Sequence, residues 1–130
     1  MRRILLVEDN EGDQFLGKFA IESVHPDIEI FVASDGREAI EILNDMETDP
    51  DLILLDINMP RMNGHEFLKV FTEDNSRVIP VVVMLTSSDQ QKDKDQAFTY
   101  KCVKDYLLKP ISEEDILAIE KIVLDVKKAA

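Results

Sequence analysis

Five short apolar runs alternate along the chain with segments whose apolar residues recur at helical spacing. Three of the runs, at 4–7, 52–55 and 81–85, are continuous, which is typical of strands buried on both faces of a sheet. The other two runs lie at 28–33 and 106–108. Strands that alternate with helices favour a parallel sheet with right-handed crossovers. The pattern therefore predicts an α/β fold with a doubly wound, five-stranded parallel sheet.

The segments between these runs predict five helices. The second is expected to follow Ser34-Asp35-Gly36, and the third to follow Gly64. The segment 91–100 carries few apolar residues, so we expect a marginal fourth helix, because helices gain most of their stability by burying an apolar face. The first helix is expected to bury a stripe formed by Phe15, Leu16, Phe19, Ala20 and Val24. The last, begun by Ser112 with Asp115 as its capping partner, is expected to bury Ile116, Leu117, Ile119, Ile122, Val123 and Val126.

The composition narrows the class of protein. The chain has 130 residues, which suits one domain, and 27 acidic against 15 basic side chains give a formal net charge of −12. A nucleic-acid partner is not expected, because binding a phosphate backbone requires clustered Lys and Arg. No apolar run approaches the ~18 residues of a membrane span, so no membrane association is expected either. The single cysteine, Cys102, cannot form an internal disulfide, which favours a cytoplasmic protein.

Polar side chains follow four of the apolar runs. Glu8 and Asp9 follow the first run, Asp56 the third, Thr86 the fourth and Lys109 the fifth. Because parallel strands end at the same edge of a sheet, these side chains are expected to meet there. Clustered carboxylates repel one another, so one pKa must rise or a cation must be bound. Mg²⁺, which prefers oxygen ligands, suits this set, and a carboxylate beside Mg²⁺, an ammonium and a hydroxyl suits phosphoryl transfer.

Four motifs resemble those of the response-regulator receiver domains, the CheY-like family, and they occur in the family's order. They are Val7-Glu8-Asp9-Asn10, then Asp56-Ile57-Asn58-Met59-Pro60 with Met62-Asn63-Gly64, then Leu85-Thr86-Ser87, and finally Asp105 to Pro110. The resemblance implies a flavodoxin-like fold with strand order 2-1-3-4-5. It also implies a single receiver domain over residues 1–130, with a core of about 3–126 and no output domain.

The resemblance implies a role for each acidic residue of the predicted site. Asp56 would be the phosphoacceptor, taking a phosphoryl group from a histidine kinase or a phosphotransfer protein. Glu8 and Asp9 would hold Mg²⁺ together with Asp56 and the backbone carbonyl of Asn58, with Asp9 the expected direct ligand. The chain would then be a stand-alone response regulator of a two-component phosphorelay. It would not be an enzyme beyond catalysing its own phosphorylation and dephosphorylation.

The remaining motif residues are implied to read out the phosphoryl group. Thr86 would hydrogen-bond it and Lys109 would pair with it, with a cis peptide between Lys109 and Pro110. Tyr106 would act as an aromatic switch that turns inward when Thr86 moves. The signal would leave through the face of the fourth helix, fifth strand and last helix, toward a downstream protein, from a monomer or a phosphorylation-dependent dimer.

Three residues depart from the family pattern. Glu8 stands where Asp is common, which lengthens the side chain and favours a water-mediated metal contact. Ser87 stands where Ala or Gly is usual, close to the expected phosphoryl group, so it bears on access and hydrolysis. Cys102 stands where a Gly often ends the fourth helix, and a positive φ at this position would strain its backbone.

Three other functions fit parts of the sequence. A small Mg²⁺-dependent phosphatase would also use an aspartyl phosphate, but such enzymes usually carry an acid two residues after the nucleophile, where this chain has Asn58. A flavodoxin-like cofactor binder would need a phosphate loop of N–H donors, where this chain has the acidic segment 8–11. A pseudo-receiver that binds partners without phosphorylation would not need the site residues to be intact.

Overall fold

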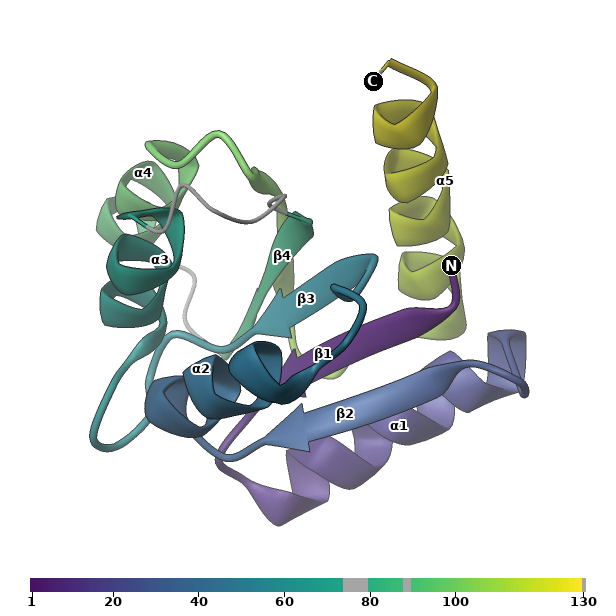
Figure 1. Ribbon diagram of the computed structural model, residues 1–130, viewed down its shortest axis with the longest axis horizontal. Helices are drawn as coiled ribbons and strands as arrows, with labels where there is room; N and C mark the ends of the chain where they lie inside the picture. Colours follow the sequence, from purple (N-terminus) through teal and green to yellow (C-terminus); the bar gives the residue numbers. More distant parts are fainter. Residues whose placement is uncertain (74–79, 88–89, 130) are drawn as a thin grey trace.

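The computed structural model describes residues 1–73, 80–87 and 90–129, and its centre is one parallel sheet (Figure 1). The strands are β1 (Arg3–Val7), β2 (Glu29–Ala33), β3 (Leu52–Leu55), β4 (Val81–Thr86) and β5 (Val103–Leu108). Their order in the sheet is β2-β1-β3-β4-β5, with all four neighbouring pairs parallel. The fold class and the strand order implied by the resemblance are therefore confirmed. The strand predicted at 106–108 is longer than expected, since β5 begins at Val103.

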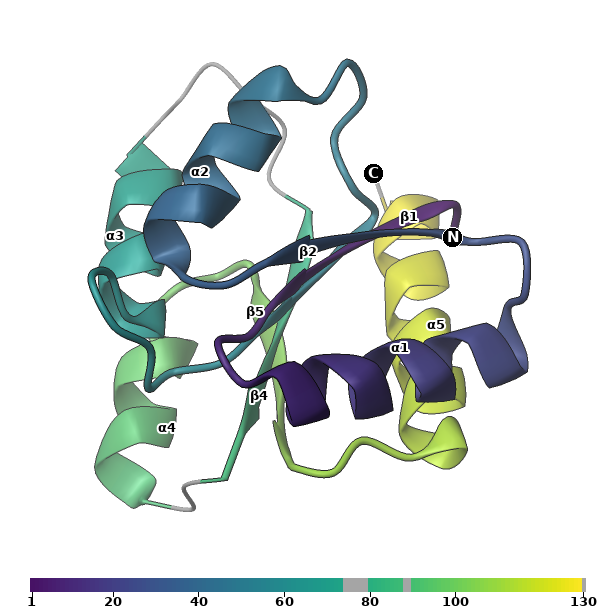
Figure 2. The ribbon, with the colours of Figure 1, turned by 90° about the horizontal axis from the view of Figure 1, so that it is seen from below.

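Within the described residues, five helices cover the two faces of the sheet (Figure 2). They are α1 (Glu11–Val24), α2 (Gly36–Asp45), α3 (Gly64–Glu73), α4 (Gln91–Phe98) and α5 (Glu113–Ala129). Helices α1 and α5 lie on one face, while α2, α3 and α4 lie on the other. None of the helices in the described residues is long and apolar enough to cross a membrane.

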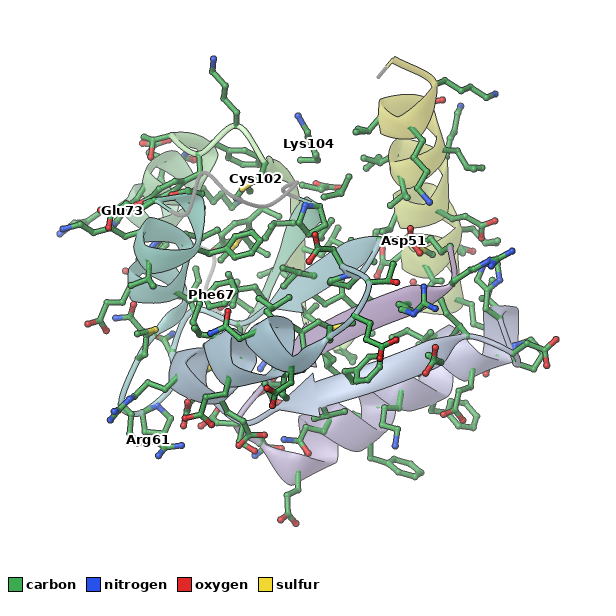
Figure 3. The ribbon with its side chains drawn as sticks, viewed as in Figure 1. Asp51, Arg61, Phe67, Glu73, Cys102 and Lys104 are labelled. Carbon is green, nitrogen blue, oxygen red and sulfur yellow. The ribbon has the colours of Figure 1, made fainter. Side chains whose placement is uncertain are left out.

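Alternate residues of the strands divide the core into two layers. Leu5 of β1 packs with α2 and α3, whereas its neighbour Leu6 packs with α1 and α5, because successive side chains of a strand point to opposite faces. Both side chains are at most 1% exposed. In the first layer, Phe67 and Phe71 of α3 stack with ring centroids 5.4 Å apart, and Phe67 lies between α3 and the sheet (Figure 3). The central strands β1, β3 and β4 are thus buried on both faces, as their continuous apolar runs predict.

Two of the predicted helix starts are confirmed by hydrogen bonds. The side chain of Asp35 caps α2 by accepting from the Glu38 amide at 2.9 Å. At α5, Ser112 and Asp115 form the expected capping box, each accepting from the other's amide. At α1 the cap is Asn10, whose side chain accepts from the Asp13 amide. The N-cap of α1 is therefore Asn10, and Glu8 supports it by accepting from the Asn10 amide at 3.1 Å.

The stripe predicted for α1 is partly wrong: Ala20 is buried and Val24 packs against the core as expected, but the larger side chains are not buried. Phe15 and Phe19 are 67% and 62% exposed, and Leu16 is also exposed. The helix instead buries a neighbouring stripe of small residues with Ile21, because Gly17 approaches so closely that an added Cβ would lie 3.2 Å from a methyl of Leu6. A large side chain on that line would hold the helix away from the sheet.

The stripe of α5 is partly wrong, for Leu117 and Val126 are exposed while Ile116, Ile119 and Val123 are buried.

Helix α4 is as weakly packed as its composition predicts. Of its residues only Ala97 is buried, and Phe98 is 49% exposed. The strain considered for Cys102 does not arise, because Arg61 is the one non-glycine residue with positive φ in the described part of the chain. Cys102 is half-buried against the core, and burial raises the pKa of its thiol.

Candidate functional site

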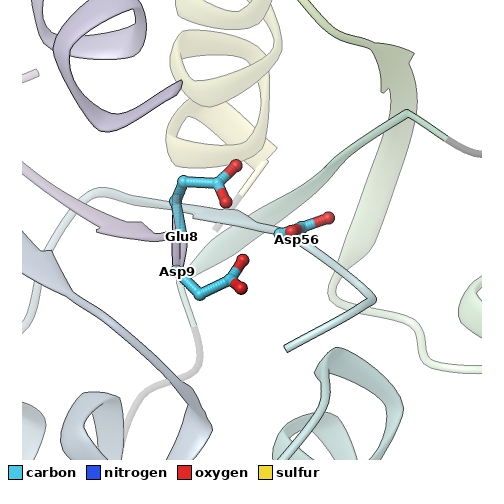
Figure 4. A group of neighbouring side chains, drawn as sticks. All are labelled: Glu8, Asp9 and Asp56. Carbon is cyan, nitrogen blue, oxygen red and sulfur yellow. The ribbon is translucent and has the colours of Figure 1, made fainter. Parts of the chain in front are cut away.

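Three carboxylates meet at the carboxyl edge of the sheet (Figure 4). Glu8 and Asp9 follow β1 and Asp56 follows β3, and one oxygen from each lies within 4.8 Å of the other two. Two backbone hydrogen bonds extend the strand ladders into the site, from the Asp56 amide to Val7 and from the Glu8 amide to Ala33. Glu8 and Asp56 are 1% and 5% exposed, while Asp9 faces solvent. The sheet itself therefore fixes the two buried carboxylates.

Lys109 brings the fifth strand into this cluster. Its Nζ lies 3.2 Å from an oxygen of Asp56 and 3.2 Å from an oxygen of Asp13, and it pairs with Glu8. The Lys109 amide donates to the Thr86 carbonyl at 2.9 Å, which ties the end of β5 to the end of β4. The Lys109–Pro110 peptide is cis, as expected.

Asp13 was not predicted to belong to the site. Asp13 lies in the first turn of α1, and this helix begins two residues after Asp9. The sequence contains a signal for it, since the first turn of a helix after a strand begins at that strand's carboxyl edge. Three carboxylates, those of Glu8, Asp13 and Asp56, thus contact the ammonium group of Lys109.

The other predicted residues lie at or near this edge. Thr86 is fully buried at the end of β4. Asn58 is exposed, two residues beyond Asp56. Tyr106 is half-buried on β5 opposite Met84, and the Nζ of Lys94 in α4 lies 5.4 Å from its ring centroid. Thr86 and Asn58 therefore lie at this edge, whereas Tyr106 lies two residues before the end of β5.

Burial dominates the protonation of the cluster. It raises the pKa of Glu8 to about 7, with the charge of Asp56 adding to the effect and the ion pair with Lys109 opposing it. Burial likewise raises the pKa of Asp56, against the effects of Lys109 and of the Ile57 amide, which donates to Asp56 at 2.8 Å. For Lys109, burial acts to lower the pKa, but its contacts with Glu8, Asp56 and Asp13 outweigh burial and raise it.

The donor set fits a hard divalent cation. The three oxygens within 4.8 Å of one another are carboxylate oxygens, the ligands that Mg²⁺ prefers. Three carboxylates lie close together, and Lys109 supplies one positive charge beside them, so negative charge is in excess at the site. Asp9 is exposed, so the site opens to solvent and leaves room for water or phosphate oxygens. These acidic residues match the metal site typical of receiver domains.

In Mg²⁺-free buffer, the free energy of unfolding is expected to fall as the pH rises from about 5 to about 8. Unfolded Glu8 loses its proton near 4.5, whereas folded Glu8 keeps it until about 7, so the folded state binds more protons between these values. The loss should be on the order of 2–3 kcal/mol. Urea denaturation at several pH values measures it. Glu8→Gln removes the titrating group, and an equally steep fall in that variant would contradict this assignment.

Comparisons with known proteins agree with this geometry. The sequence model of the protein family described as the response regulator receiver domain matches residues 4–121 of this chain. Protein PilH of Pseudomonas aeruginosa is 31% identical over 118 residues, which cover 90% of this chain and 93% of PilH. The probable methanogenesis regulatory protein FilR2 of Methanothrix harundinacea is 37% identical over 118 residues, covering 87% of this chain and 75% of that protein.

Among solved structures, a two-component response regulator from Cytophaga hutchinsonii superposes with a TM-score of 0.88 at 28% identity. The match covers 96% of this chain and 98% of that one. Family match, relatives and structure thus agree over nearly the whole chain. The chain belongs to the response regulator receiver domains, the phosphoacceptor signalling modules of two-component systems that interact with histidine kinases.

Proposed function

We propose that the protein is a stand-alone, phosphorylation-controlled switch in which Asp56 accepts a phosphoryl group from a histidine kinase or phosphotransfer protein. The observation that carries the proposal is the position of Asp56, which is buried within reach of Lys109 and of two further carboxylates. The stand-alone role is supported by PilH, of which the chain spans 93%.

The proposed chemistry is a displacement at phosphorus. A carboxylate oxygen of Asp56 forms a bond to the phosphorus atom of a phosphohistidine, and the bond from phosphorus to the imidazole nitrogen breaks, leaving its electron pair on the imidazole. Glu8, Asp9 and Asp56, with the backbone carbonyl of Asn58, would hold Mg²⁺, which neutralises phosphoryl charge when bound. Lys109 pairs with a phosphoryl oxygen, and the Thr86 hydroxyl donates to another.

The change at Asp56 would reach the surface through β4 and β5. Thr86 and Lys109 end these strands and share a backbone hydrogen bond. Movement of Thr86 toward the phosphoryl group would open space near Tyr106, and the weakly packed α4 can shift at little cost. We propose that the α4-β5-α5 face then binds a downstream protein, or a second copy as a phosphorylation-dependent dimer. Population shift of this kind needs about 5.5 kcal/mol to move a state from 1% to 99%.

The proposal is tested by intact-mass spectrometry after incubation with Mg²⁺ and acetyl phosphate. One phosphoryl group, about 80 Da, should be gained and then lost by hydrolysis, because aspartyl phosphates are covalent intermediates. No gain with Mg²⁺ present would count against it. Sustained turnover of a generic phosphate ester would instead favour the phosphatase, although Asn58 cannot supply the acid that such enzymes use.

The exposed apolar side of α1 is the surface on which we expect the phosphodonor protein to bind. Phe15 and Phe19 stack at 6.4 Å on the surface, and Leu16 lines a small hollow together with Glu8 and Lys109. Exposed apolar patches of this kind mark interaction sites, and this one adjoins a hollow lined by two residues of the carboxylate site.

Replacing Phe15 and Phe19 together by alanine is expected to slow phosphoryl transfer from a donor kinase about tenfold or more, since buried aromatic anchors dominate such interfaces. Phosphorylation by acetyl phosphate should be unchanged, because this small donor needs no docking surface. Val70→Ala, which removes an exposed apolar side chain from α3, is the matched control. Equal slowing with both donors would show that the helix acts on the site itself rather than on docking.

A further inference from the structure

The loop between β3 and α3 contains an arginine, Arg61, in an unfavourable backbone conformation. Arg61 has a φ of 64°, in the left-handed region that favours glycine. The Met62 amide donates to the Pro60 carbonyl at 2.7 Å, which closes a tight three-residue turn around Arg61. Turns of this kind are strained, and contacts of Arg61 with another segment add to the hold on it. The loop begins at Asp56 and carries Asn58.

The Arg61 guanidinium pairs with Asp35, the residue that caps α2. Nε of Arg61 lies 2.6 Å from one carboxylate oxygen of Asp35, while the other oxygen accepts from the Glu38 amide. Asp35 is only 2% exposed. Burial acts to raise its pKa, but the hydrogen bonds from Glu38 and Arg61 together lower it, so Asp35 stays charged. A buried charge of this kind holds its partner firmly, because losing the partner leaves it unpaired.

A second contact fastens the same two segments. The Gly36 amide donates to the Met62 carbonyl at 3.0 Å, and a Cβ on Gly36 would lie 2.9 Å from that carbonyl oxygen. At its base, the loop closes through a hydrogen bond from the Gly64 amide to the Ile57 carbonyl. The loop is therefore held at its base and at its tip, with Asn58 between the two.

We propose that Arg61 is a positioning residue for the metal site: its ion pair with Asp35 holds the loop so that the Asn58 backbone faces Glu8, Asp9 and Asp56. This inference rests on the proposed function, which gives Asn58 its role. In this proposed role, Arg61 contacts neither the carboxylate cluster nor the phosphoryl group. It acts through the loop, and α2 is the fixed point to which the loop is tied.

Two variants separate the ion pair from the backbone conformation. Arg61→Gly removes the guanidinium but adopts a φ of 64° without strain. Asp35→Asn keeps a capping side chain for α2 but removes the charge, because Asn caps helices as well as Asp does. Arg37→Ala is the matched control, since it removes an exposed positive charge from α2 without touching the loop.

Each variant would be measured in two ways. Isothermal titration with Mg²⁺ alone should give a 10- to 100-fold weaker affinity for Arg61→Gly and for Asp35→Asn, as is common when groups that orient metal ligands are removed. In metal-free protein, amide hydrogen exchange at Gly36 should be at least tenfold faster in both, because its acceptor, the Met62 carbonyl, is no longer held. Arg37→Ala should match the wild type within twofold in both measurements.

The outcomes separate this inference from the proposed function. Wild-type affinity for Mg²⁺ in both variants, or unchanged exchange at Gly36, would overturn the positioning role alone. A wild-type protein that binds no Mg²⁺ would overturn the proposed metal site, and this inference with it. Recovery of affinity in Arg61→Lys, which restores the charge, supports an electrostatic hold over a purely steric one.

Discussion

Replacing Asp56 by asparagine is expected to abolish the gain of about 80 Da that acetyl phosphate and Mg²⁺ produce in the wild type. An amide oxygen is not a competent nucleophile toward phosphorus, whereas it can still accept the hydrogen bond that the Ile57 amide donates at 2.8 Å. The substitution also removes a buried negative charge beside Glu8, so the fold should be kept. Intact-mass spectrometry measures the gain, and circular dichroism checks the fold.

Asp13→Asn is the matched control for this prediction. Asp13 and Asp56 each lie 3.2 Å from the Nζ of Lys109, so both substitutions remove one carboxylate from the same lysine. Only the loss of Asp56 should eliminate the adduct, because Asp13 lies outside the cluster of three carboxylates. An adduct of equal yield in Asp56→Asn would place the phosphoryl group on another residue and end the proposal.

The second large effect is expected at Gly64, which begins α3. An added Cβ at this position would lie 2.4 Å from the Asp56 carbonyl oxygen and 3.0 Å from the Ile57 Cα. Both are backbone atoms next to the proposed acceptor, so the overlap can be relieved only by moving the loop. Gly64→Ala should therefore lower the free energy of unfolding by about 3 kcal/mol or more, and it should displace Asp56. Urea denaturation measures the loss of stability.

Gly12→Ala provides the comparison. Gly12 is exposed in the first turn of α1, and a Cβ added there would meet only the side-chain oxygen of Asn10, at 3.1 Å. That side chain can move by a few tenths of an ångström, and alanine is the better helix former by about 1 kcal/mol. We expect a change of less than 1 kcal/mol in either direction. Similar losses in the two variants would contradict the steric explanation for Gly64.

The residues at the carboxyl edge of the sheet could be predicted from the sequence, because each strand appears as an apolar run that ends at a polar residue. Glu8, Asp56 and Lys109 each follow an apolar run directly, and a parallel sheet leaves such residues no other place to meet. The buried side of α1 could not be predicted in the same way. Two adjacent stripes both have helical spacing, and the choice depends on the close approach of Gly17 to Leu6, which only the packed structure reveals.

The two contacts that sequence reasoning missed have different origins. Asp13 belongs to the site because of where the first turn of α1 begins, which is a matter of helix geometry after β1. The pairing of Arg61 with Asp35 joins segments 26 residues apart, and nothing in the local sequence indicates a left-handed backbone at an arginine. Long-range contacts of this kind follow from the three-dimensional packing of the loops rather than from any periodicity.

The order of the strands has a consequence for how the molecule can respond without coming apart. The residues of the acidic cluster directly follow β1 and β3, whose side chains are mostly buried, while β5 and the weakly packed α4 lie at one edge of the sheet. Because β1 and β3 are tightly packed and α4 is not, α4 and β5 can rearrange while the centre of the sheet keeps its structure. Local opening free energies should therefore rise steadily from the α4 border toward the middle of the sheet.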